Sequence, residues 1–393
     1  MRLLNFSRGS TIIVKDSVNK GFFYIVKSGL LTVDRGQKMV EKELSRFGPG
    51  DSFGLVSALT GQKYLTTIFA ATDSQVYEIP VASLGKFLKE KKDLALRMLG
   101  LYTRELRTIH KYLARVNPPQ MRNISTEKLL QDARSYIDLK KERFAFYALE
   151  KYIEASRAGL IDGNIAAAEK LLQGLEKYTS PVWTGNSMGL GADEILFLEN
   201  EPSSEIYVVK SGAVKLFSLA RNQELVLDIL GPGEIFGEMA FIDHRNRLAS
   251  AVTETESLVM RFSKDTLLDS VGEIILQKIF ESLARRIWFS HQRLMILRIA
   301  DPLARIYAFL SSMIRDKEIR DKIHDAQVSF EFNIDLDELK KMCGLGKVNH
   351  DRIEIFLKDS NIEIGKHVIL VKNRKYVDDK IAYYMTREVN TSR

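Results

Sequence analysis

The sequence contains one cysteine, Cys343, among its 393 residues. A single thiol cannot form an internal disulfide, which excludes a disulfide-stabilised scaffold. No stretch approaches the roughly 20 apolar residues of a membrane-spanning helix, and the first ten residues lack the apolar core of a secretory signal. We therefore expect a soluble cytoplasmic protein that does not contact a membrane.

Catalytic and metal-binding patterns are also missing. There is no Ser/His/Asp or Cys/His arrangement, and the six histidines do not have the spacing of zinc ligands. We therefore expect neither an enzyme nor a bound metal or other cofactor. The composition, 45% hydrophobic and 28% charged, is that of an ordinary globular protein. The length leaves room for about two to four domains.

The net charge of +7 is unevenly distributed. Residues 1–116 contain 19 basic and 10 acidic residues, whereas residues 191–332 contain 17 basic and 22 acidic residues. A localised basic surface attracts polyanions such as nucleic acid, but dispersed lysines that only maintain solubility explain the same excess. The charge alone therefore does not identify a partner.

Two segments of the sequence recur at an offset of 183 residues. The stretch FYIVKSG at residues 23–29 recurs as IYVVKSG at residues 206–212, and GPGDSFG at 48–54 recurs as GPGEIFG at 231–237. Both copies contain short runs rich in Val, Ile, Phe and Tyr, separated by glycine and proline, which is typical of antiparallel strands. The repeat predicts two copies of one β-barrel or β-sandwich domain.

Each copy is followed by a segment with helical periodicity. Apolar residues three and four positions apart predict helices over residues 91–116 and 271–299. Between the copies, residues 125–178 resemble a single tetratricopeptide unit and predict a helical hairpin that acts as a spacer. Residues 185–191, GNSMGLG, predict a flexible connection to the second copy.

Candidate ligand-binding residues are concentrated in the second copy, within residues 237–250 (GEMAFIDHRNRLAS). Glu238 can accept a hydrogen bond from a hydroxyl, and Arg247 can contact two phosphate oxygens at once. A helix that begins here would add free N–H groups for an anion. This run resembles the phosphate-binding cassette of cyclic nucleotide-binding domains. The resemblance implies a double-stranded jelly-roll fold and a cyclic mononucleotide ligand, with Glu238 on the ribose and Arg247 on the phosphate. Further backbone contacts would come from Gly237, Ala240 and Leu248.

Two other interpretations of this run exist. Glu238 and Arg247 could form a surface ion pair worth only ~0–1 kcal/mol. The Gly-Pro-Gly-x-x-x-Gly string nearly matches a dinucleotide-binding fingerprint, but the βαβ context of that fingerprint is missing. The first copy has Leu55 and Tyr64 at the two matching positions. Neither side chain can replace the carboxylate or the guanidinium, so we expect the first copy to be a structural or dimer-forming domain, or one adapted to another ligand or protein.

From Arg285 onward the sequence resembles the Crp/Fnr (catabolite-activator-like) family of bacterial transcription regulators. The matching residues are Arg285, Arg286, Ile287, Asp301, Ala304, Arg305 and Ile306. The resemblance implies a homodimer that pairs along residues 271–299, and it places Ser290 and His291 near the purine of the ligand. Serine keeps a hydroxyl for an exocyclic amine, whereas histidine departs from the family pattern. Leu248 stands where cGMP-selective domains often carry threonine, which favours cAMP.

The C-terminal residues predict a winged helix-turn-helix. Asp335 and Glu338 have capping-box spacing, a turn follows at Gly344, and a second helix covers about residues 347–358. Residues 362–371, IEIGKHVILV, predict a two-stranded wing. The beginning of the second helix contacts base edges in such a motif, and this assigns DNA contacts to Lys347, Asn349 and Arg352. His350 and Glu354 depart from the family pattern, so a wing that binds a protein remains an alternative.

Together these features predict an α+β protein with four parts. They are a degenerate cyclic-nucleotide-binding-like domain (1–116), a helical spacer (117–185), a cyclic nucleotide-binding domain with a dimerisation helix (186–300) and a DNA-binding domain (301–393). The predicted function is a cyclic-nucleotide-responsive transcription regulator, with cAMP favoured, that binds double-stranded DNA as a homodimer. RNA polymerase is a further candidate partner. The alternatives are a second-messenger sensor or adaptor that does not bind DNA, and a ligand-independent scaffold.

Overall fold

The computed structural model describes most of the chain and divides it into two compact units. The described residues are 1–34, 46–116, 125–203, 205–220, 223–237, 246–263, 273–321, 329–332, 334–345, 350–366 and 368–391. The first unit consists of Met1–Thr108 and Pro119–Ala284, and the second of Ile109–Pro118 and Arg285–Arg393. Two long helices, α3 (Lys92–Val116) and α9 (Glu273–Ile296), contribute to both units. None of the described helices has the length and apolar character needed to cross a membrane.

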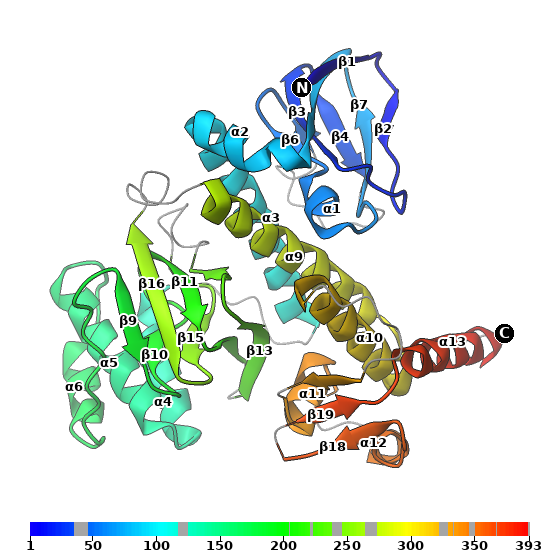
Figure 1. Cartoon of the computed structure of the whole chain (residues 1–393). Coiled ribbons are helices and arrows are strands. Elements are labelled where there is room, and N and C mark those ends of the chain that lie inside the picture. The colour runs from blue at the N-terminus through cyan, green and yellow to red at the C-terminus, as the bar shows by residue number, and fades with distance from the viewer. Residues whose placement is uncertain are drawn as a thin grey trace. The chain divides into compact units, whose positions relative to one another are not determined.

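The first copy of the repeat folds into two four-stranded antiparallel sheets (Figure 1). One sheet has the order β1-β8-β3-β6 and the other β2-β7-β4-β5. The strands are β1 (Arg2–Phe6), β2 (Thr11–Ile13), β3 (Phe22–Ser28), β4 (Leu31–Asp34), β5 (Arg46–Phe47), β6 (Ser52–Phe53), β7 (Thr67–Ala70) and β8 (Ser74–Pro80). Helix α1 (Leu55–Thr60) follows β6, and η2 (Val81–Ser83) and α2 (Leu84–Glu90) precede α3. Inward-facing residues such as Val26, Leu31 and Val76 form the core.

The second copy has the same two sheets. Their orders are β14-β11-β16-β9 and β10-β15-β12-β13. The strands are β9 (Ser187–Leu190), β10 (Ile195–Phe197), β11 (Glu205–Ser211), β12 (Val214–Ala220), β13 (Gln223–Leu230), β14 (Ile235–Phe236), β15 (Ser250–Thr253) and β16 (Ser257–Ser263). The chain therefore contains two β-sandwich domains of one topology within an α+β protein.

The strand registers confirm the repeat. Tyr24 pairs with Phe53 in the first copy and Tyr207 with Phe236 in the second, which preserves the offset of 183. Before β3 and β11 the offset is 184, because Ile13 pairs with Ile68 whereas Phe197 pairs with Ala251. The second copy thus has one residue fewer between these strands, and the aromatic Phe197 stands where the first copy has Ile13.

The spacer differs from the predicted helical hairpin. It contains η3 (Thr126–Lys128), α4 (Leu129–Asp138), α5 (Glu142–Arg157) and a third helix, α6 (Ile165–Leu172). Its apolar faces share one core with the second sandwich, where Tyr136 and Leu149 of the spacer join Phe217 and Val252. This segment is therefore packed on the second copy and is not a free-standing connector.

The prediction of a flexible connection over residues 185–191 was wrong. Ser187–Leu190 forms β9, which pairs with β16 so that Leu190 lies opposite Ser257 and Ser187 opposite Met260. Leu190 is buried in the core of the second copy and Met188 packs against that core. Met188 and Leu190 are apolar and are separated by Gly189, and this short alternation is sufficient to form an edge strand.

Helices α3 and α9 contact each other within the chain. In the first unit the ring of Tyr102 meets that of Phe280 edge-on, with centroids 6.2 Å apart. Every residue from 282 to 288 on α9 is at most 9% exposed. Since seven residues span about two helical turns, all sides of α9 are covered in this stretch. Glu273 and Lys278 on the same helix are exposed, and the pairing of α9 between two chains stays a prediction.

The second unit combines helices with a small sheet. Its elements are α10 (Pro302–Asp321), β17 (Phe330–Phe332), α11 (Leu336–Met342), α12 (His350–Leu357), β18 (Ile362–Ile364), β19 (Ile369–Val371) and α13 (Arg374–Thr391). The capping box is confirmed, because the Asp335 carboxylate accepts from the Glu338 N–H at 2.7 Å and Glu338 accepts from the Asp335 N–H at 3.2 Å. The predicted hairpin over 362–371 is present as β18 and β19, and β17 adds a third strand that the sequence did not suggest.

Candidate functional site

Arg247 is the centre of the candidate site, in the first unit just before β15. Its side chain is only 2% exposed, although arginine is rarely buried so completely. One terminal nitrogen donates to the Gly237 carbonyl at 2.8 Å, and the other donates to the Ser203 hydroxyl. The guanidinium is therefore fixed next to the residue at which the predicted phosphate-binding cassette begins.

Two aromatic rings support the guanidinium. Its central carbon lies 4.0 Å from the ring centroid of Phe197 and 5.3 Å from that of Tyr207, and Phe236 stacks on Tyr207 at 5.2 Å. Cation–π contacts of this kind are strongest when the charge is removed from water. Sequence reasoning did not assign Phe197 or Tyr207 to the site. The recurrence of Tyr24 as Tyr207 was visible, but it was equally consistent with a core position.

Gly237 is required by its conformation and by its neighbour. Its φ of 78° lies in the left-handed region that favours glycine. A Cβ at this position would lie 2.4 Å from a terminal nitrogen of Arg247, too close for any real contact. A side chain on residue 237 would therefore both strain the turn and displace the guanidinium.

A partly buried carboxylate, Glu201, interacts with the positive charge of Arg247. It accepts hydrogen bonds from the Leu198 N–H at 3.0 Å and the Tyr147 hydroxyl at 3.2 Å. Burial raises the pKa of Glu201, while these hydrogen bonds and the charges of Lys151 and Arg247 oppose that rise. Burial also raises the pKa of Tyr147 and of Tyr207, so both tyrosines remain neutral donors at physiological pH. The Glu201 carboxylate partly balances the guanidinium when no anion is bound.

The structure brings together two of the residues predicted to bind the ligand, Gly237 and Arg247. Leu248 follows Arg247 and is half-buried. Glu238 and Ala240 lie outside the described residues. Ser290 and His291 lie on the part of α9 that belongs to the second unit, where Ser290 is half-buried and His291 is 8% exposed. Their contact with a purine stays a prediction.

The residues predicted to contact DNA are only partly described. Lys347 and Asn349 lie outside the described residues, and Arg352 is described only as a backbone position on α12. The nearby Cys343 is buried, and burial raises the pKa of its thiol to about 12, so it is not a thiolate at neutral pH. Within the described ranges, no group of His, Cys, Asp and Glu side chains could hold a metal ion.

The corresponding position of the first copy is occupied by Tyr64. This side chain is 9% exposed and belongs to the core of the first sandwich. The Gly54 carbonyl, the counterpart of the Gly237 carbonyl, accepts from the Asn19 side-chain amide at 3.0 Å instead of from an arginine. Leu55, at the position of Glu238, is 1% exposed. A phosphate would thus meet a phenol and a leucine where the second copy offers a guanidinium and a carboxylate.

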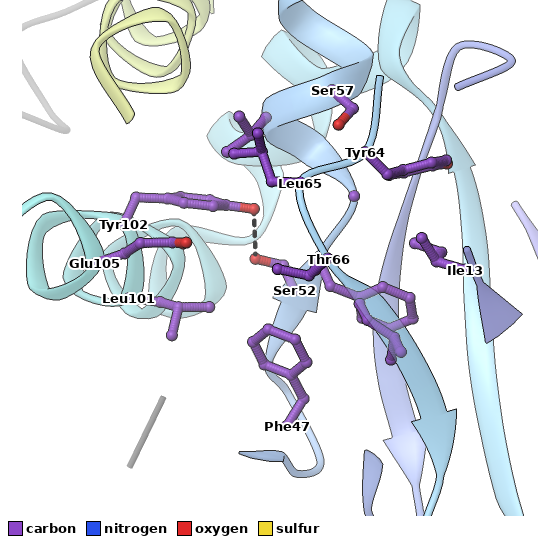
Figure 2. Close-up of a pocket in the computed structure, with 14 residues that line it drawn as sticks. Ile13, Phe47, Ser52, Ser57, Tyr64, Leu65, Thr66, Leu101, Tyr102 and Glu105 are labelled. Atoms are coloured by element: carbon purple, nitrogen blue, oxygen red, sulfur yellow. Dashed lines mark hydrogen bonds between the residues drawn. The ribbon is translucent and has the colours of Figure 1, made fainter. Parts of the chain in front are cut away.

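A small cavity of about 50 Å³ remains beside Tyr64 in the first copy (Figure 2). Tyr102 and Glu105 of α3 line one side, and the Ser52 hydroxyl hydrogen-bonds to the Tyr102 hydroxyl at 3.4 Å. This volume holds a few water molecules. The lining contains a carboxylate and no lysine or arginine, which does not suit a phosphate ligand.

Comparison with known proteins agrees with this geometry. The family model described as cyclic nucleotide-binding domain matches residues 3–91 and 189–272. A CRP-like cAMP-activated global transcriptional regulator from Mycobacterium tuberculosis is 29% identical over 154 residues, which are 38% of this chain and 65% of that protein. The cyclic AMP receptor protein of Thermus thermophilus is 29% identical over 123 residues, 30% of this chain and 57% of that protein.

The solved structure of a CRP-family transcriptional regulator from Thermus thermophilus is 15% identical and has a TM-score of 0.38. The match covers 50% of this chain and 96% of that one. Of the two sequence relatives named above, the matched part of this chain spans less than two thirds of the length. The two matches of the family model identify two cyclic nucleotide-binding domains in tandem, and the chain is similar to the Crp/Fnr-like regulators named above.

Proposed function

We propose that the second copy binds a cyclic mononucleotide, preferably cAMP, and that this ligand controls transcription. The observation that carries the proposal is the buried guanidinium of Arg247, fixed 2.8 Å from the Gly237 carbonyl at the start of the cassette. A guanidinium already removed from water interacts more strongly with an arriving phosphate than an exposed one does. Glu238 would accept from the ribose hydroxyl.

The preference for cAMP has two supports. Leu248 follows Arg247 and offers no hydroxyl to a guanine. Both sequence relatives described above are named for cAMP. Titration of the whole chain with cAMP, cGMP and cyclic di-GMP by calorimetry tests the proposal. We expect the tightest binding for cAMP, and absence of heat with all three would refute nucleotide control.

The C-terminal part supports a proposed winged helix-turn-helix that binds DNA. Helices α11 and α12 are followed by the β18–β19 hairpin, in the order that such a motif requires. Lys347, Asn349 and Arg352 would contact base edges. DNA fragments selected from random sequence, titrated at increasing salt concentration, provide the test. Binding that weakens steeply with salt supports the proposal, because phosphate contacts release counterions.

The adaptor alternative is favoured by the surface of α12. Residues 350–357 contain one arginine and two acidic residues, and the apolar Ile355 and Leu357 are 49% and 47% exposed. An acidic helix with exposed apolar side chains suits a protein surface better than a phosphate backbone. If no DNA binds even at low salt while cAMP still binds, the adaptor function replaces transcription control.

The assembly we propose also differs from the predicted homodimer. Residues 282–288 of α9 are buried within the chain, and Tyr102 of α3 contacts the helix at Phe280. We infer that the two copies of one chain form the helix pair that two chains were expected to form. The active particle would then be a monomer that carries a single DNA-binding motif.

A further inference from the structure

The spacer makes polar contacts with the segments that carry Arg247. The Asn246 side-chain amide, next to Arg247 in the sequence, donates to the Thr126 hydroxyl of η3 at 2.8 Å and to the Asn200 carbonyl at 2.8 Å. Asn246 thus joins the spacer to two segments of the second sandwich, although Thr126 is 120 positions away in the sequence.

Asn200 forms the second connection. Its side-chain amide donates to the Asp132 carboxylate of α4 at 2.7 Å, and its side-chain oxygen accepts from the Ser125 N–H at 3.2 Å. Asn200 is 1% exposed and has a φ of 75°, a left-handed conformation that non-glycine residues rarely adopt. Contacts from the spacer therefore fix both the amide nitrogen and the amide oxygen of this side chain.

The backbone transmits these contacts to Arg247. The Asn200 N–H donates to the Arg247 carbonyl at 2.9 Å, and the Arg247 N–H donates to the Glu201 carbonyl at 2.8 Å. The spacer also holds Glu201 directly through the Tyr147 hydroxyl. Both backbone groups of Arg247 are consequently bonded to residues that the spacer fixes.

We propose that the spacer is a working part of the nucleotide site, and that Thr126, Asp132, Asn200 and Asn246 are positioning residues for Arg247. The identity of the ligand in this inference rests on the proposed function, whereas the coupling between the spacer and Arg247 does not. Because coupling between two sites is reciprocal, a nucleotide that engages Arg247 stabilises the docked spacer, and a docked spacer raises nucleotide affinity.

The first test removes a single hydroxyl. Thr126→Val keeps the volume of the side chain but leaves Asn246 without its acceptor in the spacer. We expect the Kd for cAMP to rise roughly 3- to 10-fold, the effect of losing one neutral hydrogen bond. Thr126→Ser, which restores the hydroxyl, should return the affinity to that of the parent. Ser156→Ala is the matched control, since this spacer hydroxyl bonds to the Tyr152 carbonyl of its own helix.

A lower thermal midpoint in Thr126→Val with unchanged cAMP affinity would show that the spacer only covers apolar surface, and would overturn the inference. A second measurement needs no nucleotide. The Arg247 amide should exchange its hydrogen several-fold faster in Thr126→Val than in the parent chain, because its bond to Glu201 is less well held. If the parent chain binds no cyclic nucleotide, the proposed function fails. The coupling between the spacer and Arg247 is then rejected only if the Arg247 amide exchanges at the same rate in Thr126→Val and in the parent.

Discussion

Arg247→Lys is the sharpest test of the nucleotide site. Arg247→Ala would confuse two effects, because the buried side chain packs against the rings of Phe197 and Tyr207 and its removal leaves a cavity. Loss of such a side chain costs about 2–4 kcal/mol of folding free energy. Lysine keeps the positive charge and much of the volume, but it cannot bond to two partners in one plane.

The expected effect on binding follows from the two bonds of the guanidinium, one to the Gly237 carbonyl and one to Ser203. A phosphate that engages the same fork would lose one charged hydrogen bond in the lysine variant. Such a bond contributes about 1.5–3 kcal/mol, so the Kd for cAMP should rise roughly 10- to 150-fold. The assay is calorimetric titration at 25 °C, with thermal unfolding measured on the same samples.

Arg97→Lys provides the matched control. Arg97, like Arg247, donates two hydrogen bonds from its guanidinium, in this case both to the Asp51 carboxylate of the first copy, at 3.0 and 3.1 Å. This substitution should leave cAMP affinity unchanged. If Arg247→Lys binds cAMP as tightly as the parent while remaining folded, Arg247 does not contact the phosphate and the reasoning fails.

Three further predictions concern the whole chain. Calorimetry should give one cAMP per chain, because Tyr64 stands in the first copy where the second copy has Arg247, the residue that we propose binds the phosphate; two equivalents would refute this assignment. Sedimentation velocity should give a monomer at micromolar concentration, and a stable dimer would show that α9 is free to pair between chains. Burial and the charges of Arg286 and Arg293 lower the pKa of His110 from 6.5 to about 3, so it stays neutral in the native state. Unfolded chains take up this proton below about pH 6.5, and native stability should fall by about 1 kcal/mol between pH 7.5 and 5.5. Urea unfolding of His110→Gln should lose that part of the pH dependence, and an unchanged dependence would contradict it.

The strands and the repeat were predictable from the sequence for physical reasons. Strand residues alternate between core and surface, and turns need glycine or proline, so the same pattern recurs at a constant offset. The positions of Gly237 and Arg247 followed from this offset and from the cassette. The offset also identified Leu55 and Tyr64 as the residues of the first copy at the positions of Glu238 and Arg247, and both are buried in the structure.

The polar network behind Arg247 was not predictable. Its contacts join residues far apart in the sequence, such as Ser125 with Asn200 across 75 positions and Thr126 with Asn246 across 120. Periodicity reports which face of an element is apolar, but not which distant element covers that face. The same limit applies to α9: its apolar face could be identified from the sequence, but the sequence does not say whether that face pairs within the chain or with a second chain.

The turn glycines of the two copies have a consequence for counting ligand sites in proteins of this kind. Gly54 and Gly237 have nearly the same φ, 77° and 78°, yet only Gly237 lies beside a guanidinium. Both sandwiches thus have the same backbone turn, whether or not an arginine lies beside it, and the family model matches both. A search that scores the shared turn counts both copies alike, so whether a copy can bind an anion must be judged from the side chain ten positions after the glycine, which is Tyr64 in one copy and Arg247 in the other.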